Sequence, residues 1–152
     1  LSTGMATLDE IIQAVEVLRK YGASDITVLH CVSSYPVKPE ECNLKAIETI
    51  KKTLNIKAGW SDHSVNPGVI YRAVHKYEAD IIEFHIDLDG RGEEFSSGHC
   101  WLPDDIGKVI KTIKDGFSSD GDGVKKPLPA ELPDLLWRAD PSDGLRPFKE
   151  IR

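Results

Sequence analysis

The sequence predicts an α/β fold built around a parallel sheet. Short apolar runs rich in β-branched residues alternate with longer segments whose apolar residues recur at helical spacing, and a polar segment follows each apolar run. Alternating strands and helices make successive strands parallel through right-handed crossovers. A length of 152 residues with 40% hydrophobic content is enough for one domain with a sizeable core.

The first helix has the clearest start signal. Thr7 and Glu10 form a capping box, in which each side chain satisfies a backbone N–H in the first turn. Gly22 supplies a stop signal at the other end. The apolar face of this predicted helix consists of Leu8, Ile11, Ile12, Val15 and Leu18.

Further strand–helix units follow. The run ITVLHC reads as a buried strand, and Asn66 and Pro67 have the residue types of a helix N-cap and first helical position. If the first three residues are the stub of a strand, the chain contains four βα units. The predicted strands are residues 1–3, 26–31, 58–61 and 80–86, and the later helices are residues 44–54, 67–77 and one that begins at Pro103.

Four βα units fit either a small open doubly wound sheet or half of an eight-stranded TIM-type barrel. In both folds, ligands bind beyond the carboxyl ends of the strands. The chain opens on Leu1 without an initiator methionine, as though within a strand, and this favours the half-barrel. A half-barrel leaves two strand edges unpaired, so it is expected to need its other half or a second copy.

The composition changes near residue 116. We predict that residues 1–115 form the half-barrel and that residues 116–152 form a Pro/Gly-rich C-terminal extension that packs on it. Residues 118–123 (SSDGDG) read as a flexible link, and five prolines interrupt the remainder of the extension. A short helix could still dock through Leu132, Leu135, Leu136 and Trp137.

Charge and composition exclude several classes of partner. A net charge of −6 argues against a nucleic-acid surface, which requires clustered Lys and Arg. No apolar run is long enough to cross a bilayer, so no membrane partner is expected. Cys31, Cys42 and Cys100 lie far apart without a Cys-x-x-Cys spacing, and this indicates reduced thiols in the cytoplasm.

Two histidines at the ends of neighbouring strands indicate a metal site. His63 ends the run after Trp60, and His85 ends the next predicted strand. Two neutral imidazoles can share one divalent ion and leave open positions for water and substrate, as a Lewis-acid catalyst requires. The alternative is that each histidine only caps its strand and hydrogen-bonds a backbone carbonyl. The sequence leaves both interpretations open.

Other polar residues near the carboxyl ends of the predicted strands could bind substrate. Ser33, Tyr35 and Ser61 belong to a hydroxyl-rich rim, and such hydroxyls with loop amides can hold a phosphate. Taken singly, Ser33 is better explained as a simple turn residue. His30 reads as part of the pocket wall, and His99 is better explained by packing of a long loop.

An acidic loop comes after His85. Residues 87–95 (DLDGRGEEF) do not have EF-hand spacing, but their carboxylates could accept hydrogen bonds from sugar hydroxyls. A solvated loop without a ligand is the alternative interpretation.

Four motifs carry a resemblance to a known family. They are LSTGM at residues 1–5, LHCVSSYP at 29–36, GWSDHS at 59–64 and IEFH at 82–85. Together, from residue 1 to about 113, they resemble the sialic-acid (N-acetylneuraminate) synthase family, which condenses phosphoenolpyruvate with an N-acetylated sugar aldehyde. The tail, with WRADP at 137–141, is similar to that of the shorter spore-coat polysaccharide synthases.

The resemblance implies a TIM-type barrel of which this chain supplies the C-terminal half. It implies that His63 and His85 are catalytic and bind a divalent metal, most simply Mn²⁺. The loop after His85 departs from the family pattern, so an acidic side chain such as Glu93 or Glu94 would replace the usual sugar-binding Asp. The substrate-binding residues implied by position are Ser2, Ser33, where many members have Asn, Tyr35, Ser61 and Glu94.

The activity implied by the resemblance is synthesis of a sialic-acid-type nonulosonic acid for surface polysaccharide. Phosphoenolpyruvate and an N-acetylmannosamine-like sugar would be the substrates, and a homodimer the assembly. Acidic and lysine side chains from the first half of the family barrel are not in this chain, so residues 1–152 alone are expected to be inactive. The alternatives are another metal-dependent aldol-type barrel enzyme and a non-catalytic half-barrel.

Overall fold

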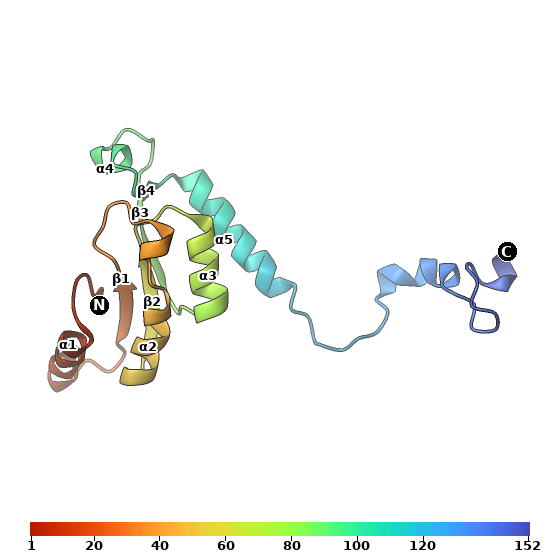
Figure 1. Ribbon diagram of the computed structural model, residues 1–152, viewed down its shortest axis with the longest axis horizontal. Coiled ribbons are helices and arrows are strands. Elements are labelled where there is room, and N and C mark those ends of the chain that lie inside the picture. The colour runs from red at the N-terminus through yellow and green to blue at the C-terminus, as the bar shows by residue number, and fades with distance from the viewer. The chain divides into compact units, whose positions relative to one another are not determined.

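Four parallel strands form one sheet in the order β1-β2-β3-β4 (Figure 1). The structure is a computed structural model that describes residues 1–152, and it contains two compact units, Leu1–Phe117 and Ser118–Arg152. The sheet and its covering helices belong to the first unit. The prediction of an α/β fold with a parallel sheet is therefore confirmed.

The strands follow the predicted order, and most of their bounds agree within a few residues. Ser2 pairs with Leu29 as an isolated parallel bridge, so the first residues do lie beside a strand. Cys31 lies opposite Ser61, and Ser61 lies opposite Glu83, which sets one register across the sheet. The strands are β1 (Thr27–Cys31), β2 (Lys57–Asp62), β3 (Ile82–Ile86) and β4 (Cys100–Trp101).

The helices begin where their capping signals place them. Thr7 accepts from the backbone N–H of Glu10 and the Glu10 side chain returns to Thr7, so the predicted capping box forms. Asn66 caps a helix that opens on a proline. The helices around the sheet are α1 (Leu8–Lys20), α2 (Lys45–Leu54), α3 (Pro67–Tyr77) and α5 (Pro103–Ser118), with a 3₁₀ turn at Pro39–Glu41.

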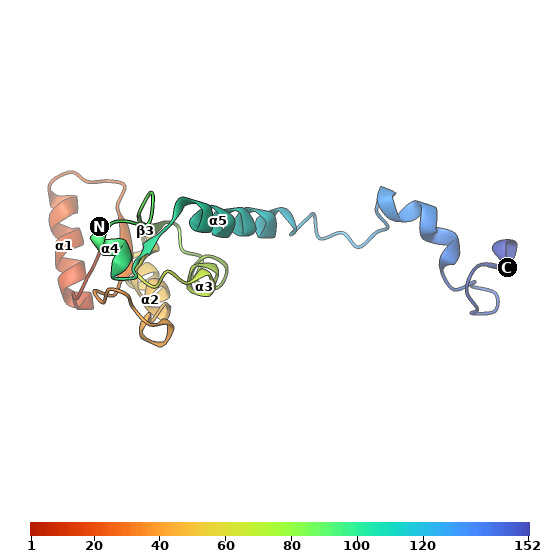
Figure 2. The ribbon, with the colours of Figure 1, turned by 90° about the horizontal axis from the view of Figure 1, so that it is seen from above.

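The two faces of the sheet have different environments. Val28, Ala58 and Trp60 face the helices and are fully buried in one apolar cluster with residues of α1, α2 and α3. Figure 2 shows these three helices around one side of the strands. Because side chains alternate along a strand, the residues directly before and after each of these three point to the opposite face of the sheet. At Gly59 a side chain would collide with the carbonyl oxygen of Ile81, so the strands approach closely there.

The segment between β3 and α5 was not predicted. In place of a simple loop it contains the short helix α4 (Glu93–Ser96) and the two-residue strand β4, which pairs with β3. A two-residue strand has no measurable periodicity, and its pairing depends on a partner that lies far away in the sequence. The fourth βα unit therefore carries an insertion between its strand and its helix.

The second unit, Ser118–Arg152, has a 3₁₀ helix at Pro129–Trp137 and another at Lys149–Ile151. None of its apolar side chains is buried, and Asp140 is its single buried residue. The predicted packing of this segment on the barrel stays a prediction. Across the chain, no helix combines the length and apolar character needed to cross a membrane.

Candidate metal and substrate site

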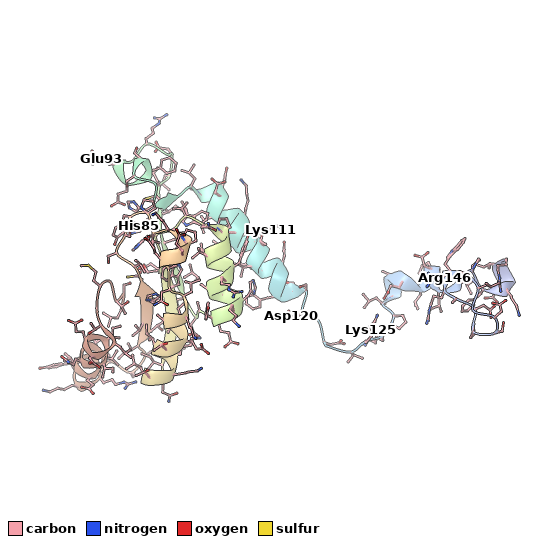
Figure 3. All side chains as sticks on the ribbon, viewed as in Figure 1. His85, Glu93, Lys111, Asp120, Lys125 and Arg146 are labelled. Carbon is pink, nitrogen blue, oxygen red and sulfur yellow. The ribbon has the colours of Figure 1, made fainter.

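The structure brings the two predicted metal ligands together at the carboxyl end of the sheet. His63 follows β2 directly and is buried, and His85 is the fourth residue of β3. Their ring centroids lie 5.2 Å apart. Figure 3 shows His85 at this end of the sheet, near the loop that carries Glu93. The proximity was predicted from the strand ends, whereas metal binding by the pair stays a prediction.

Backbone contacts fix the orientation of His63. Its Nδ1 lies 2.8 Å from the carbonyl oxygen of Val32, and its own carbonyl accepts the N–H of Val37 at 3.1 Å. A carbonyl oxygen can only accept, so the proton of this imidazole is on Nδ1. The lone pair is then on Nε2, which is the atom free to bind a metal ion.

A carboxylate orients His85 in the same manner. Its Nδ1 lies 3.3 Å from Oε2 of Glu94, whose side chain is largely exposed. An ionised carboxylate only accepts hydrogen bonds, which again places the proton on Nδ1 and the lone pair on Nε2. Histidines that bind metal commonly donate their second nitrogen to a carboxylate or carbonyl in this way.

A third imidazole lies beside the pair. His99 precedes β4 and is only 6% exposed, and its ring centroid is 5.0 Å from that of His85. Burial lowers the pKa of His99, and the nearby His85 adds to this shift, so the ring is neutral at neutral pH. The interpretation of His99 as packing of a long loop is incomplete, because its ring also contacts His85 of β3.

Tyr35 contacts all three imidazoles. The centroid of its ring lies 4.2 Å from His63, 5.1 Å from His99 and 6.0 Å from His85. Its side chain is 49% exposed, so one part of the ring covers the histidines and the other faces solvent. This position is compatible with the predicted contact to substrate, which stays a prediction.

Glu83 joins two of the predicted substrate residues. Its Oε1 accepts the hydroxyl of Ser61 at 2.8 Å and the hydroxyl of Ser2 at 3.0 Å. Sequence reasoning did not select Glu83 as a site residue. The signal was present, since Glu83 precedes His85 by two residues and therefore points to the same face of β3. The site thus has an acidic group between two hydroxyls.

Ser33 and His30 lie outside this group of contacts. Ser33 is exposed, with its hydroxyl near Gly4. The interpretation of His30 as pocket wall is wrong: its Nε2 bonds the carbonyl of Cys42 at 2.9 Å and its ring contacts Trp60 on the helix side of the sheet. Neighbouring residues of a strand point to opposite faces of the sheet. His30 therefore points away from the face of its neighbour Cys31, which lies opposite Ser61 of the site.

A buried carboxylate supports the segment that carries His63. Asp62 is fully buried and accepts the indole N–H of Trp60 at 3.0 Å and that of Trp101 at 3.1 Å. It also accepts from the backbone N–H of Ser64 and of Val65. These bonds tie β2 to β4 and hold the turn that follows the strand, so Asp62 fixes the backbone on both sides of His63.

One cluster of side chains has the donor types and spacing for a metal ion. The ligand atoms of His85, Glu94, His99 and Cys100 all lie within 4.8 Å of one another. Burial and the Glu94 carboxylate raise the pKa of the Cys100 thiol, which keeps it protonated. Imidazole and carboxylate donors suit a divalent first-row metal, so the residues fit such an ion.

The fold and these side chains define a class of protein: a parallel α/β sheet with imidazoles and hydroxyls gathered beyond its carboxyl end, as in enzyme barrels. The NeuB family model matches residues 1–125. The chain belongs to the NeuB family, and the resemblance to sialic-acid synthases is confirmed.

Individual relatives agree with this assignment. The chain is 39% identical over 132 residues to the uncharacterized protein MJ1065 of Methanocaldococcus jannaschii, covering 86% of this chain and 39% of that protein. It is 36% identical over 133 residues to an N,N'-diacetyllegionaminic acid synthase of Campylobacter jejuni, covering 86% of this chain and 40% of that one. The chain therefore spans about two fifths of the length of these relatives.

A solved structure extends the comparison to the fold. The crystal structure of N-acetylneuraminic acid (sialic acid) synthetase from Leptospira borgpetersenii, in complex with citrate, matches with a TM-score of 0.71 and 30% identity. The match covers 94% of this chain and 50% of that one. The sheet and helices described above are thus similar to half of a synthase of this family.

Proposed function

We propose that this chain forms the C-terminal half of a (β/α)8 synthase barrel. The whole barrel would condense phosphoenolpyruvate with an N-acetylmannosamine-like sugar aldehyde and water, giving a sialic-acid-type nonulosonic acid and phosphate for surface polysaccharide. A new C–C bond would join the methylene carbon of phosphoenolpyruvate to the aldehyde carbon, and water would replace phosphate at the neighbouring carbon. Family membership and relatives named as synthases of such acids support the proposal.

The observation that carries the proposal is the orientation of His63 and His85. Both rings use Nδ1–H for a contact within the protein, to the Val32 carbonyl and the Glu94 carboxylate, and both therefore offer the lone pair of Nε2. A divalent ion such as Mn²⁺, when bound there, would act as a Lewis acid on the aldehyde oxygen. The protein's part is to orient both imidazoles through these two contacts.

The hydroxyls of Ser2 and Ser61 would bind the phosphate group. At present both donate to Oε1 of Glu83, so phosphate binding requires them to turn from the carboxylate to the substrate. Ser33 and the loop amides around it would add further donors on the same rim. Glu83 would then be available to accept a proton from a group that donates within the site.

The sugar would lie on the exposed side of the imidazoles. Tyr35 covers the three rings and limits the access of water to them. Glu94 is exposed enough to accept a sugar hydroxyl while it orients His85, which would combine its predicted substrate role with a positioning role.

The rest of the barrel must come from strands that this chain does not contain. The stub at Ser2 together with β1, β2 and β3 fits one half of an eight-stranded barrel, and β4 belongs to the insertion after β3. We therefore assign the activity to the full-length barrel, working as a homodimer, and expect residues 1–152 alone to be inactive. The three cysteines are free and buried, in keeping with a reducing cytoplasm.

The test is phosphate release by the full-length protein that carries these residues. Phosphoenolpyruvate, N-acetylmannosamine and Mn²⁺ are supplied together and each is then omitted in turn. We expect release to need all three, and His63→Ala and His85→Ala to lower kcat at least about 100-fold by loss of the metal. His75→Ala is the matched control, because this exposed histidine of α3 lies against Phe117, away from the site.

The other results have defined meanings. Metal binding without phosphate release would point to a different acceptor or to another aldol-type reaction. Full activity in both histidine variants would overturn the proposed site. No metal binding and no turnover would leave a non-catalytic half-barrel.

A further inference from the structure

We infer that His99 is a third imidazole ligand of the metal ion, beside His63 and His85. This inference rests on the proposed function and extends it, because the expected site has only two histidines. The metal site would then have three histidine ligands in place of two, and the third would come from the insertion that contains α4 and β4.

The hydrogen bonds around His99 determine which ring nitrogen is free. Ser97 donates its single hydroxyl proton to the carbonyl oxygen of Glu94 at 2.8 Å. The Ser97 oxygen, 2.9 Å from Nδ1 of His99, must therefore accept the Nδ1–H. The lone pair of His99 is then on Nε2, as it is in His63 and His85. All three imidazoles are thus in the tautomer that offers Nε2.

The position of Nε2 favours a ligand over a structural contact. Its nearest charged neighbour is Oε2 of Glu94 at 3.9 Å, which is longer than a hydrogen bond. No buried side-chain nitrogen or oxygen lacks a hydrogen-bond partner, so Nε2, which has none within the protein, reaches solvent and is accessible to an ion. Here one nitrogen is anchored by Ser97, and the centroid of the His99 ring lies 5.0 Å from that of His85.

The spacing allows one ion to reach the third ring. The ligand atoms of His85, Glu94 and His99 lie within 4.8 Å of one another, and the rings of His63 and His85 are 5.2 Å apart by their centroids. Neighbouring ligands of an octahedral ion lie roughly 3 Å apart, as expected from metal–oxygen distances near 2.1 Å. Binding of one ion would therefore require the imidazole nitrogens to move closer together.

A third imidazole should change metal affinity and choice. Imidazole donors favour cobalt, nickel and zinc over manganese more strongly than oxygen donors do. We therefore expect the site to retain its ion more tightly than one with two histidines.

The test measures Mn²⁺ binding to the metal-free full-length protein, by the electron paramagnetic resonance signal of the free ion. His99→Asn is the informative variant, because the Asn amide can donate to Ser97 as Nδ1–H does but has no group in the position of Nε2. We expect this variant to keep the wild-type melting temperature without metal and to bind Mn²⁺ at least about 10-fold more weakly. His75→Asn serves as the control at an exposed site.

Spectra of the Co²⁺-loaded protein provide a readout that a structural role would not change. Loss of one nitrogen ligand should alter the visible absorption in His99→Asn and leave it unaltered in His75→Asn. Unchanged Mn²⁺ affinity and an unchanged Co²⁺ spectrum in His99→Asn, with binding lost in His63→Ala and His85→Ala, would overturn the third ligand and leave the proposed function intact. Binding that none of the three histidines affects would overturn both.

Discussion

Leu1–Phe117 and Ser118–Arg152 each contain one buried aspartate, but the surroundings of the two carboxylates differ. Asp62 lies among apolar side chains and receives two indole N–H groups that join β2 to β4. Asp140 lies in a segment without a buried apolar side chain, and its carboxylate accepts hydrogen bonds from Ser142 and Lys149, within nine residues of it. Long-range burial organises the first unit, and local hydrogen bonds organise the second.

The comparison indicates where a functional site can be built. A site needs side chains held within a fraction of an ångström, and this requires a packed support. The imidazoles lie on strands and turns that the apolar core and Asp62 hold in place. The second unit offers no such support, and apart from Asp140 its side chains are partly or fully exposed to solvent.

The largest expected effect is that of Asp62→Ala. Removal of the carboxylate leaves the buried N–H groups of Trp60 and Trp101 without a partner, and each such group costs about 1–3 kcal/mol. We expect the free energy of unfolding to fall by about 3–5 kcal/mol, measured by urea denaturation of the full-length protein. A loss below about 1 kcal/mol would mean that water replaces the carboxylate and that burial is not what holds this region.

A smaller effect is expected at Trp137. If the apolar row of the second unit docks on the barrel, as the sequence predicts, then Trp137→Ser, at a side chain 63% exposed within its own unit, should destabilise the barrel. We expect about 1 kcal/mol, or a fall of a few degrees in melting temperature. Lys125→Ser, at an exposed residue of the same unit, is the control. An unchanged melting temperature in Trp137→Ser would show that the second unit is independent.

The smallest expected effect is a local change with pH. The hydroxyl of Ser142, and then the N–H of Lys149, hold the pKa of Asp140 at about 2, below its ordinary value near 4. A carboxyl whose pKa is lower in the folded state stabilises that state above the unfolded pKa. This stabilisation is therefore complete above about pH 4 and is lost as the pH falls through 2.

Amide exchange between pH 5 and pH 2, corrected for its intrinsic pH dependence, would detect this loss. The N–H groups of Ser142 and Lys149 should lose protection, while those of β1 and β2 keep theirs. The Asp140→Asn variant should lack the transition. Protection of both amides that stays constant down to pH 2 would contradict a role for the ionised carboxylate.

The sequence by itself determined most of the helices, and it placed the two predicted metal ligands at the carboxyl ends of neighbouring strands. Thr7 and Glu10 are local signals, as are Asn66 and Pro67, and they place helix starts without knowledge of the rest of the fold. His63 and His85 could be paired because parallel strands bring their carboxyl ends to one edge of the sheet. The family resemblance also required only the sequence motifs.

Tertiary structure alone decided which other groups join the site. Ser2 reaches Glu83 across 81 positions, and Trp101 reaches Asp62 across 39. His99 enters the site because β4 pairs with β3, and a strand of two residues has no periodicity by which it could be recognised. Local patterns specify elements, whereas contacts between distant residues depend on the register and order of strands, which only the folded sheet fixes.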